Sequence, residues 1–136
     1  MQKLTITTKQ EKEIVDLTKI LNDLLMKNGH FDGLLFLSVS HTTCSVTTAD
    51  LDPGGTDKDY LDAITSIMPK LNYKHPHNPE HVPDHIASSI IGTSCFLQVQ
   101  SGSIVLGQYQ KVVLIELNGP GDRRLNISFL AEKEGI

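Results

Sequence analysis

The chain has 136 residues, 39% of them hydrophobic and 21% charged, which supports one folded domain over residues 1–136 and excludes collagen-like, low-complexity and disordered proteins. The formal net charge is −4 and no basic stripe is present, which argues against binding of a long nucleic acid. Apolar runs are far too short to span a membrane, and no signal-like segment opens the chain. We therefore expect a cytoplasmic protein that binds neither nucleic acid nor membranes.

The first third of the chain predicts a strand, a helix and more strand. Residues 3–8 alternate and are β-branched, which indicates an opening strand. Thr8 and Glu11 have the spacing of a capping box and predict that a helix follows directly. Its apolar residues at helical spacing are Ile14, Leu17, Leu21, Leu24 and Leu25. Residues 33–48 are β-branched without a helical period, so we expect one long strand or two strands broken near His41.

Two shorter helices are expected in the middle of the chain. Thr56 to Met68 has an apolar stripe, a possible cap at Thr56 and a terminating proline. Residues 70–80 are polar and interrupted by proline, which predicts a loop. Pro83 suits a first helical turn, and the isoleucines up to Gly92 predict a short third helix.

The last third consists of strand-like runs separated by glycine turns. The runs are residues 95–100, 104–106, 109–117 and 124–130. Short connections make these runs antiparallel neighbours. The sum is an α+β fold with a mostly antiparallel β-sheet and helices packed to one side.

Histidines are concentrated in one part of the chain, because four of the six lie between His75 and His85. Neutral imidazoles are common ligands of divalent metals, and several on one loop can converge on an ion. The alternative is a solvated polar loop whose histidines are incidental. His41 stands apart in an apolar run before two hydroxyl residues, which fits either a site residue or a hydrogen-bonded core histidine.

Two groups of charged residues are candidates for binding a metal ion or a small phosphate. Aspartates between Asp50 and Asp62 offer hard oxygen ligands for Mg²⁺, or else cap and solvate a helix. Arg123 and Arg124 follow a glycine turn, where guanidinium and backbone N–H groups suit a small phosphate. The same pair would also protect a sheet edge with charge. Neighbouring strand residues face opposite sides, so at most one of the two arginines should point inward.

The order and spacing of these pieces resemble the YjbQ-like family, also described as secondary thiamine-phosphate synthase. The resemblance covers nearly the whole chain. Its motifs are His41-Thr-Thr, Asp52-Pro with Asp59 ten residues before Pro69, Tyr73-Lys-His75, Val82-Pro-Asp-His85-Ile-Ala-Ser-Ser-Ile-Ile-Gly92, Gly102, Leu106-Gly-Gln-Tyr-Gln110, and Glu116 with the glycine turn before Arg123-Arg124. The chain departs from the usual pattern at Ala49-Asp50, where relatives have Asn-Glu, and at Tyr109, where they have Trp.

Membership of this family implies a homotrimer of α+β subunits with sites near the subunit boundaries. The implied catalytic residues are His41, Asp59, Gln110, Arg123 and Arg124. The implied substrate-binding residues are Thr42, Thr43, Asp50, Tyr109 and Glu116. A divalent metal ion, Mg²⁺ or Zn²⁺, would be held by His41, His75 and His85, whereas His77 and His81 match no family position.

The activity implied by the resemblance is a transferase reaction. A pyrimidine methyl diphosphate is joined to a thiazole phosphate, giving thiamine phosphate and diphosphate. A metal ion with Arg123 or Arg124 would stabilise the negative charge on the departing diphosphate. Two alternatives stay open: a metal-dependent hydrolase of a small phosphate or ester, and a non-catalytic trimer that binds a metal or small anion. The first expectation is therefore an enzyme with a small phosphorylated substrate.

Overall fold

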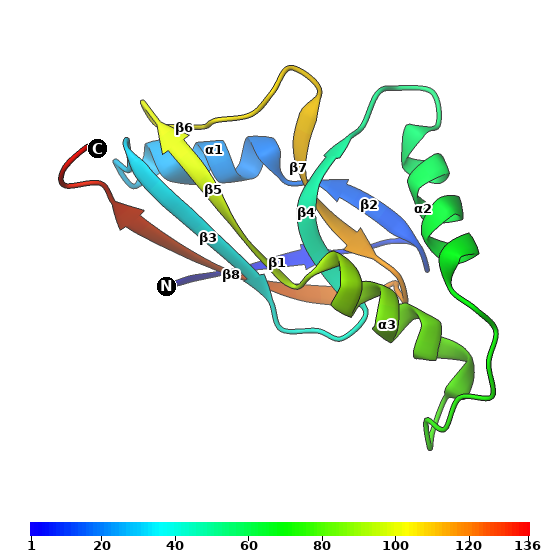
Figure 1. Cartoon of the computed structure of the whole chain (residues 1–136). Coiled ribbons are helices and arrows are strands. Elements are labelled where there is room, and N and C mark those ends of the chain that lie inside the picture. The colour runs from blue at the N-terminus through cyan, green and yellow to red at the C-terminus, as the bar shows by residue number, and fades with distance from the viewer.

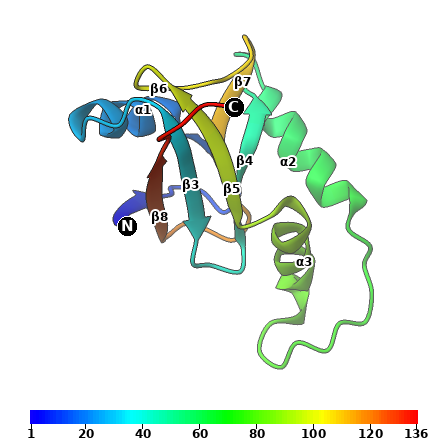
Figure 2. The same cartoon turned by 60° about the vertical axis from the view of Figure 1, so that its left-hand side comes forward.

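The computed structural model describes all residues from Met1 to Ile136 and has two antiparallel sheets with helices (Figures 1 and 2). The strands are β1 (Gln2–Thr7), β2 (Glu13–Asp16), β3 (Gly33–Val39), β4 (Cys44–Asp50), β5 (Ser94–Gln100), β6 (Ser103–Ile104), β7 (Gln110–Glu116) and β8 (Asp122–Ala131). The helices are α1 (Thr18–Lys27), α2 (Thr56–Ile67) and α3 (Val82–Ile91), with a 3₁₀ turn, η1 (Pro79–His81), before α3. The α+β class with mostly antiparallel sheet is confirmed.

The elements form successive layers. The five-stranded sheet has the order β1-β8-β3-β5-β6, and the three-stranded sheet has the order β2-β7-β4. The larger core lies between these sheets and α1 and includes Leu21, Leu37 and Leu114. A second core, with Val113 and Ile115, lies between the three-stranded sheet and helices α2 and α3. The helices therefore all lie on one side of the five-stranded sheet, as the sequence predicts (Figure 2).

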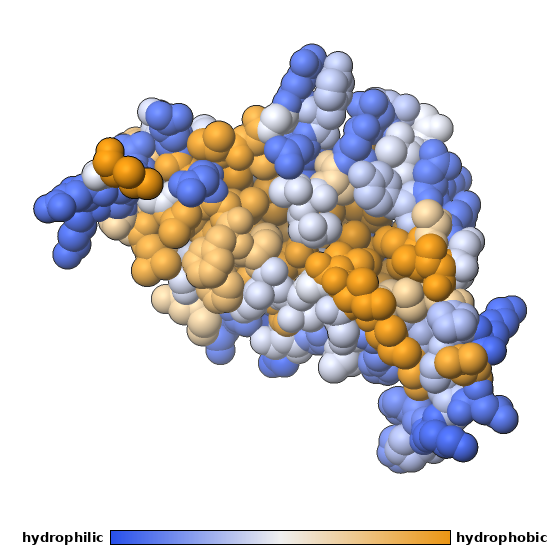
Figure 3. All heavy atoms as spheres, viewed as in Figure 1, coloured by the Kyte–Doolittle hydropathy of each residue, from blue (hydrophilic) through white to orange (hydrophobic).

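The outer face of the five-stranded sheet carries no helix and combines apolar side chains with polar ones such as Gln98 and Ser128. Phe36 on β3 and Phe96 on β5 are directly opposite each other, with ring centroids 4.7 Å apart. Phe96 is 60% exposed and Leu130 on β8 is 55% exposed. Figure 3 shows this region as a broad hydrophobic area over β3 and β5. An apolar area of this kind is typical of an interaction surface.

The prediction of a helix starting after Thr8 is wrong. Residues 13–16 form β2, and the helix begins only at Thr18. The strand lies between two cores: Val15 packs on the larger core and Ile14 on the second core. Neighbouring residues that face opposite sides are typical of a strand and not of a helix. The Thr8 hydroxyl caps no helix, because it accepts the N–H of Gly121 at 3.0 Å.

Most of the remaining elements follow the sequence pattern, but the expectation that the last strands are all antiparallel neighbours is wrong. Strand β5 pairs with β6, whereas β7 pairs with β2 and β4 in the three-stranded sheet, and β8 pairs with β1 and β3 in the five-stranded sheet. The β-branched run divides into β3 and β4, with the break at His41. Helix α2 begins at Thr56, but the Thr56 side chain does not cap it. Gly55 is the N-cap residue, and no side chain accepts a hydrogen bond from the free N–H groups of the first turn of the helix. No helix of the structure is long and apolar enough to cross a membrane. The cytoplasmic location stays a prediction.

Candidate functional site

The structure distributes the expected site residues over three places. Strands β4 and β7 are antiparallel, with Cys44 opposite Glu116 at one end and Asp50 opposite Gln110 at the other. Six residues of extended strand separate these ends by about 20 Å. The third place is the start of α3 and the loop before it, where His85 meets His75.

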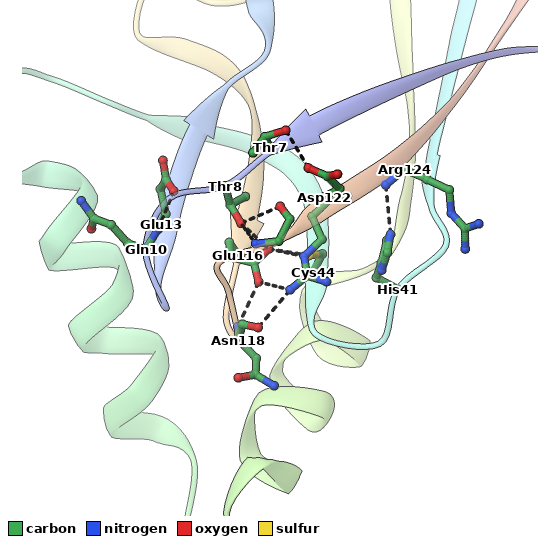
Figure 4. A network of polar contacts seen from close by, with 12 residues as sticks. Thr7, Thr8, Gln10, Glu13, His41, Cys44, Glu116, Asn118, Asp122 and Arg124 are labelled. Carbon is green, nitrogen blue, oxygen red and sulfur yellow. Dashed lines mark hydrogen bonds and ion pairs between the residues drawn. The ribbon is translucent and has the colours of Figure 1, made fainter.

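The most elaborate arrangement surrounds the carboxylate of Glu116 at the end of β7 (Figure 4). This side chain is 0% exposed. Arg123 of β8 donates Nη2–H to Oε1 at 2.7 Å, and its Nε–H donates to Oε2. The Cys44 thiol donates to Oε2 at 3.1 Å, the Thr8 hydroxyl to Oε2 at 3.4 Å, and the Asn118 N–H to Oε1 at 3.2 Å. These five donors occupy the carboxylate, so Glu116 and Arg123 stabilise the turn after β7, and the Glu116 carboxylate has no free position for a ligand.

Burial and charge act in opposite directions on this group. Burial raises the pKa of Glu116, but hydrogen bonds from Arg123 and Cys44 and the arginine charge outweigh it and hold the pKa below its ordinary value. Glu116 is therefore a buried carboxylate paired with a guanidinium, the arrangement that buried ionised groups require. Burial, followed by the hydrogen bond to Glu116, raises the pKa of the Cys44 thiol to about 12. Cys44 is thus an unreactive thiol inside the fold.

The neighbouring arginine points the other way. Arg124 is exposed, and its guanidinium forms no hydrogen bond or ion pair with the protein (Figure 4). Its backbone N–H donates to Nε2 of His41 at 2.9 Å. This bond requires a lone pair on Nε2, so the neutral His41 ring carries its proton on Nδ1. Burial, and then the charges of Arg123 and Arg124, lower the pKa of His41 below its usual range.

The expectation that at most one arginine faces inward is met: Arg123 faces inward and Arg124 faces outward. Thr42, next to His41 in the β3–β4 loop, is exposed, whereas Thr43 is buried and its carbonyl accepts the N–H of Leu117 at 3.0 Å. The corner formed by His41, Thr42 and Arg124 is therefore the accessible part of this region. We call these three residues the His41 corner.

The opposite end of the β4–β7 pair holds four other expected residues. Gln110 accepts the N–H of Gly107 through Oε1 at 2.7 Å, and Tyr109 is 61% exposed. The Asp50 carboxylate accepts the N–H of Asp52 at 3.0 Å, so it closes the turn that follows β4. Asp59 is exposed on α2. No hydrogen bond or ion pair joins Asp59 to the other three residues, and the chain alone joins none of the four to the His41 corner.

The three histidines expected to hold a metal ion do not form one centre within the chain. His75 and His85 are stacked, with ring centroids 5.3 Å apart and planes inclined by 9°. Nδ1 of His75 accepts the N–H groups of His77 and Asn78 at 3.2 and 3.0 Å, which places the proton of the neutral ring on Nε2 and leaves no free lone pair. Nε2 of His41 is engaged by a backbone N–H in the same way.

No group of three or more His, Cys, Asp or Glu side chains in the chain is arranged to hold a metal ion. The donor set of this arrangement therefore does not fit a three-histidine metal centre. The Mg²⁺ or Zn²⁺ cofactor stays a prediction.

One polar group was missed by the sequence reasoning. The carboxylate of Asp84 in α3 accepts Lys12 Nζ–H on Oδ1 at 2.8 Å and His81 Nδ1–H on Oδ2 at 3.1 Å. Lys12 and Asp84 are 72 residues apart in the sequence, and no local pattern connects them. His81, to which the family resemblance gives no role, thus belongs to a defined cluster.

The fold is that of several solved structures. The structure of a YbjQ-like protein of unknown function from Sulfolobus solfataricus P2 superimposes with a TM-score of 0.87 at 25% identity, covering 96% of each chain. That of a hypothetical protein from Aeropyrum pernix K1 gives a TM-score of 0.84 at 28% identity, covering 96% of this chain and 98% of the other.

Sequence comparison gives the same result. The family model described as UPF0047 protein YjbQ-like matches residues 2–132, so the chain belongs to the UPF0047 family. The UPF0047 protein YjbQ of Escherichia coli O157:H7 is 32% identical over 126 residues, covering 90% of this chain and 91% of the relative. The UPF0047 protein MJ1081 of Methanocaldococcus jannaschii is 26% identical over 131 residues, covering 96% and 94%.

These findings correct the expected activity. The relatives carry the designation of an uncharacterised protein family, and the similar structures are named as proteins of unknown function or hypothetical proteins. None of these names supports a thiamine-phosphate synthase. The assignment of that transferase activity is therefore wrong, because the family resemblance on which it depended carries no such function, and it is not retained.

Proposed function

We propose that the chain binds a small phosphorylated molecule at the His41 corner, as one subunit of a homotrimer. The observation that carries the proposal is the unpaired guanidinium of Arg124 beside a histidine whose remaining ring group is an N–H donor. Guanidinium groups bind phosphate oxygens through two parallel hydrogen bonds. The Thr42 hydroxyl, exposed in the same loop, is a further donor.

The electrostatics of the corner favour an anion. The same arginine charges that lower the pKa of His41 make its surroundings favourable for a phosphate oxygen. Arg123 adds to this charge while Glu116 holds its guanidinium through Nε and Nη2. A bound phosphate would add negative charge near the ring and thereby raise the pKa of His41.

Assembly into a trimer would bury the apolar area on the outer face of the five-stranded sheet. Phe96 and Leu130 lie exposed on adjoining parts of that face, and a contiguous apolar surface is costly to leave in water. Copies of the same chain are a common solution for exposed sheet surfaces. The family resemblance implies the number three, which the outer face itself does not specify.

Phosphate binding is tested by following His41 with NMR during titration with inorganic phosphate. We expect the pKa of His41 to rise when phosphate binds. Substitution Arg124→Met should weaken binding by about tenfold or more, the scale of a lost charge-assisted hydrogen bond. Lys27→Met removes the same charge from the end of α1 and serves as the matched control. Equal phosphate affinity in the two variants would remove the proposal.

Assembly is tested separately by light scattering coupled to size-exclusion chromatography. We expect a mass of three chains for the unmodified protein and a smaller species for Phe96→Ser. Ile67→Ser removes a comparably exposed apolar side chain from α2, 67% exposed against 60% for Phe96, and should leave the mass unchanged. A single-chain mass for the unmodified protein would refute the trimer and leave the phosphate test standing.

A further inference from the structure

A concave site lies between α2, the start of α3 and the segment that precedes β2, and none of the residues of the His41 corner lines it. It has a volume of about 440 Å³, within the range of small-molecule sites. Its apolar wall includes Ile64, Met68 and Leu71. Its polar side includes the cluster of Lys12, Asp84 and His81. We call this hollow the α2–α3 groove.

The cluster at the inner side of the groove is electrically balanced. Both oxygens of the Asp84 carboxylate are occupied, one by Lys12 and one by His81. The side chains are 30% exposed for Lys12, 14% for Asp84 and 23% for His81, so the pair is partly shielded from water. Since Asp84 accepts from Nδ1, the neutral His81 ring carries its proton there and keeps a lone pair on Nε2. In this neutral form the cluster presents a hydrogen-bond acceptor at Nε2 of His81.

The hydroxyl groups of the groove have no hydrogen left to donate to a ligand. The Tyr73 hydroxyl donates to the carbonyl of Pro69, and the Thr65 hydroxyl donates to the carbonyl of Leu61. Glu11 and Glu80 are exposed, and their carboxylates form no ion pair or hydrogen bond. Lys70 is the one unpaired cation among the lining residues. With the Lys12–Asp84 pair neutral, the free charges sum to −1.

We propose that the α2–α3 groove binds a small organic ammonium ion with an apolar body. The ammonium group would donate hydrogen bonds to His81 Nε2 and to the carboxylates of Glu11 and Glu80. The apolar body would lie against Ile64, Met68 and Leu71. A carboxylate or phosphate ligand is disfavoured, because it would meet two like charges and an acceptor nitrogen. This site is independent of the one proposed at the His41 corner.

The test uses benzylammonium as the probe, followed by ¹H–¹⁵N NMR of the full chain. We expect saturable shifts at the groove residues and at Nε2 of His81, with a Kd of about 1 mM, the scale for so small a ligand. Benzoate has the same ring with the opposite charge and should bind at least fivefold more weakly. Equal binding of benzoate, or no saturable shift with benzylammonium, would overturn the proposal.

Two double variants then locate the site. Glu11→Gln with Glu80→Gln should weaken benzylammonium binding about fivefold or more, and the fold should be unaffected because both side chains are exposed. Glu132→Gln with Glu134→Gln makes the same change in net charge at the C-terminus and should leave binding unaltered. Equal weakening in both double variants would show a general charge effect and refute the groove as the binding site.

Discussion

Removing the guanidinium of Arg123 is expected to destabilise the fold severely. Arg123→Met keeps most of the side-chain volume but leaves the Glu116 carboxylate, 0% exposed, without its cation. The substitution also removes the two hydrogen bonds to Glu116 and the one to the Asn118 carbonyl. Breaking a buried ion pair in this way costs about 3–5 kcal/mol of unfolding free energy.

The expected loss is large compared with the stability of a domain of this size. Total unfolding free energies are about 5–15 kcal/mol, so Arg123→Met would remove a third or more of a typical value. With an unfolding entropy of about 2.1 cal/mol/K per residue, the melting temperature of the 136-residue chain should fall by about 10–17 °C. Arg124→Met is the matched control. Its exposed guanidinium has no protein partner, and the change should stay within about 0.5 kcal/mol.

Urea unfolding at two pH values separates the charge effect from lost packing. In the unmodified protein the lowered pKa of Glu116 means that its stabilisation is present at neutral pH and is lost as the pH falls through that pKa. In Arg123→Met the unpaired carboxylate takes up a proton more readily, because burial raises its pKa. The difference between the two proteins should therefore be smaller at pH 4 than at pH 7. A loss below 1 kcal/mol at pH 7, or one matched by Arg124→Met, would refute this reasoning.

Three further outcomes follow from the same geometry. Because the pKa of the Cys44 thiol is about 12, iodoacetamide should leave it unmodified in the folded protein at pH 8 and alkylate it after unfolding; alkylation detected by mass spectrometry in the folded state would contradict its burial. Gly33→Ala should lower the free energy of unfolding measured in urea by about 2 kcal/mol or more, because the added Cβ would overlap a backbone carbonyl of β8. An unchanged free energy of unfolding would mean that the strands can separate there. Burial and then the two arginine charges lower the pKa of His41, so Arg124→Met should raise it in an NMR titration, and an unchanged value would remove the arginine as a cause.

Patterns that repeat over many residues predicted the fold well. The β-branched run from Gly33 to Thr48 is long enough to show the strand period, and the structure has β3 and β4 there with the break at His41. Residues 13–16 were misassigned because four residues are too few to distinguish strand alternation from one helical turn. The spacing of Thr8 and Glu11 fits a cap, but Gly121 takes the Thr8 hydroxyl, and a contact over 113 residues leaves no local signal.

The site residues illustrate the same limit. The alternation of strand side chains predicted that only one of Arg123 and Arg124 could face inward. Their roles depend on Glu116, whose place at the end of β7 is fixed by sheet pairing and not by its neighbours in sequence. The clustered histidines were visible in the sequence, yet the use of Nδ1 of His75 by backbone N–H groups depends on the loop conformation. The family resemblance predicted the fold correctly and the activity incorrectly.

The opposite orientation of two adjacent arginines has an evolutionary consequence. Codon 123 is under constraint from folding alone, since a change there leaves a charge stranded in the interior. Codon 124 is free of that constraint, because its side chain supports nothing in the subunit. Under the phosphate binding proposed for the His41 corner, a substitution at codon 124 alone would change the ligand preference, while the adjacent codon keeps the protein folded.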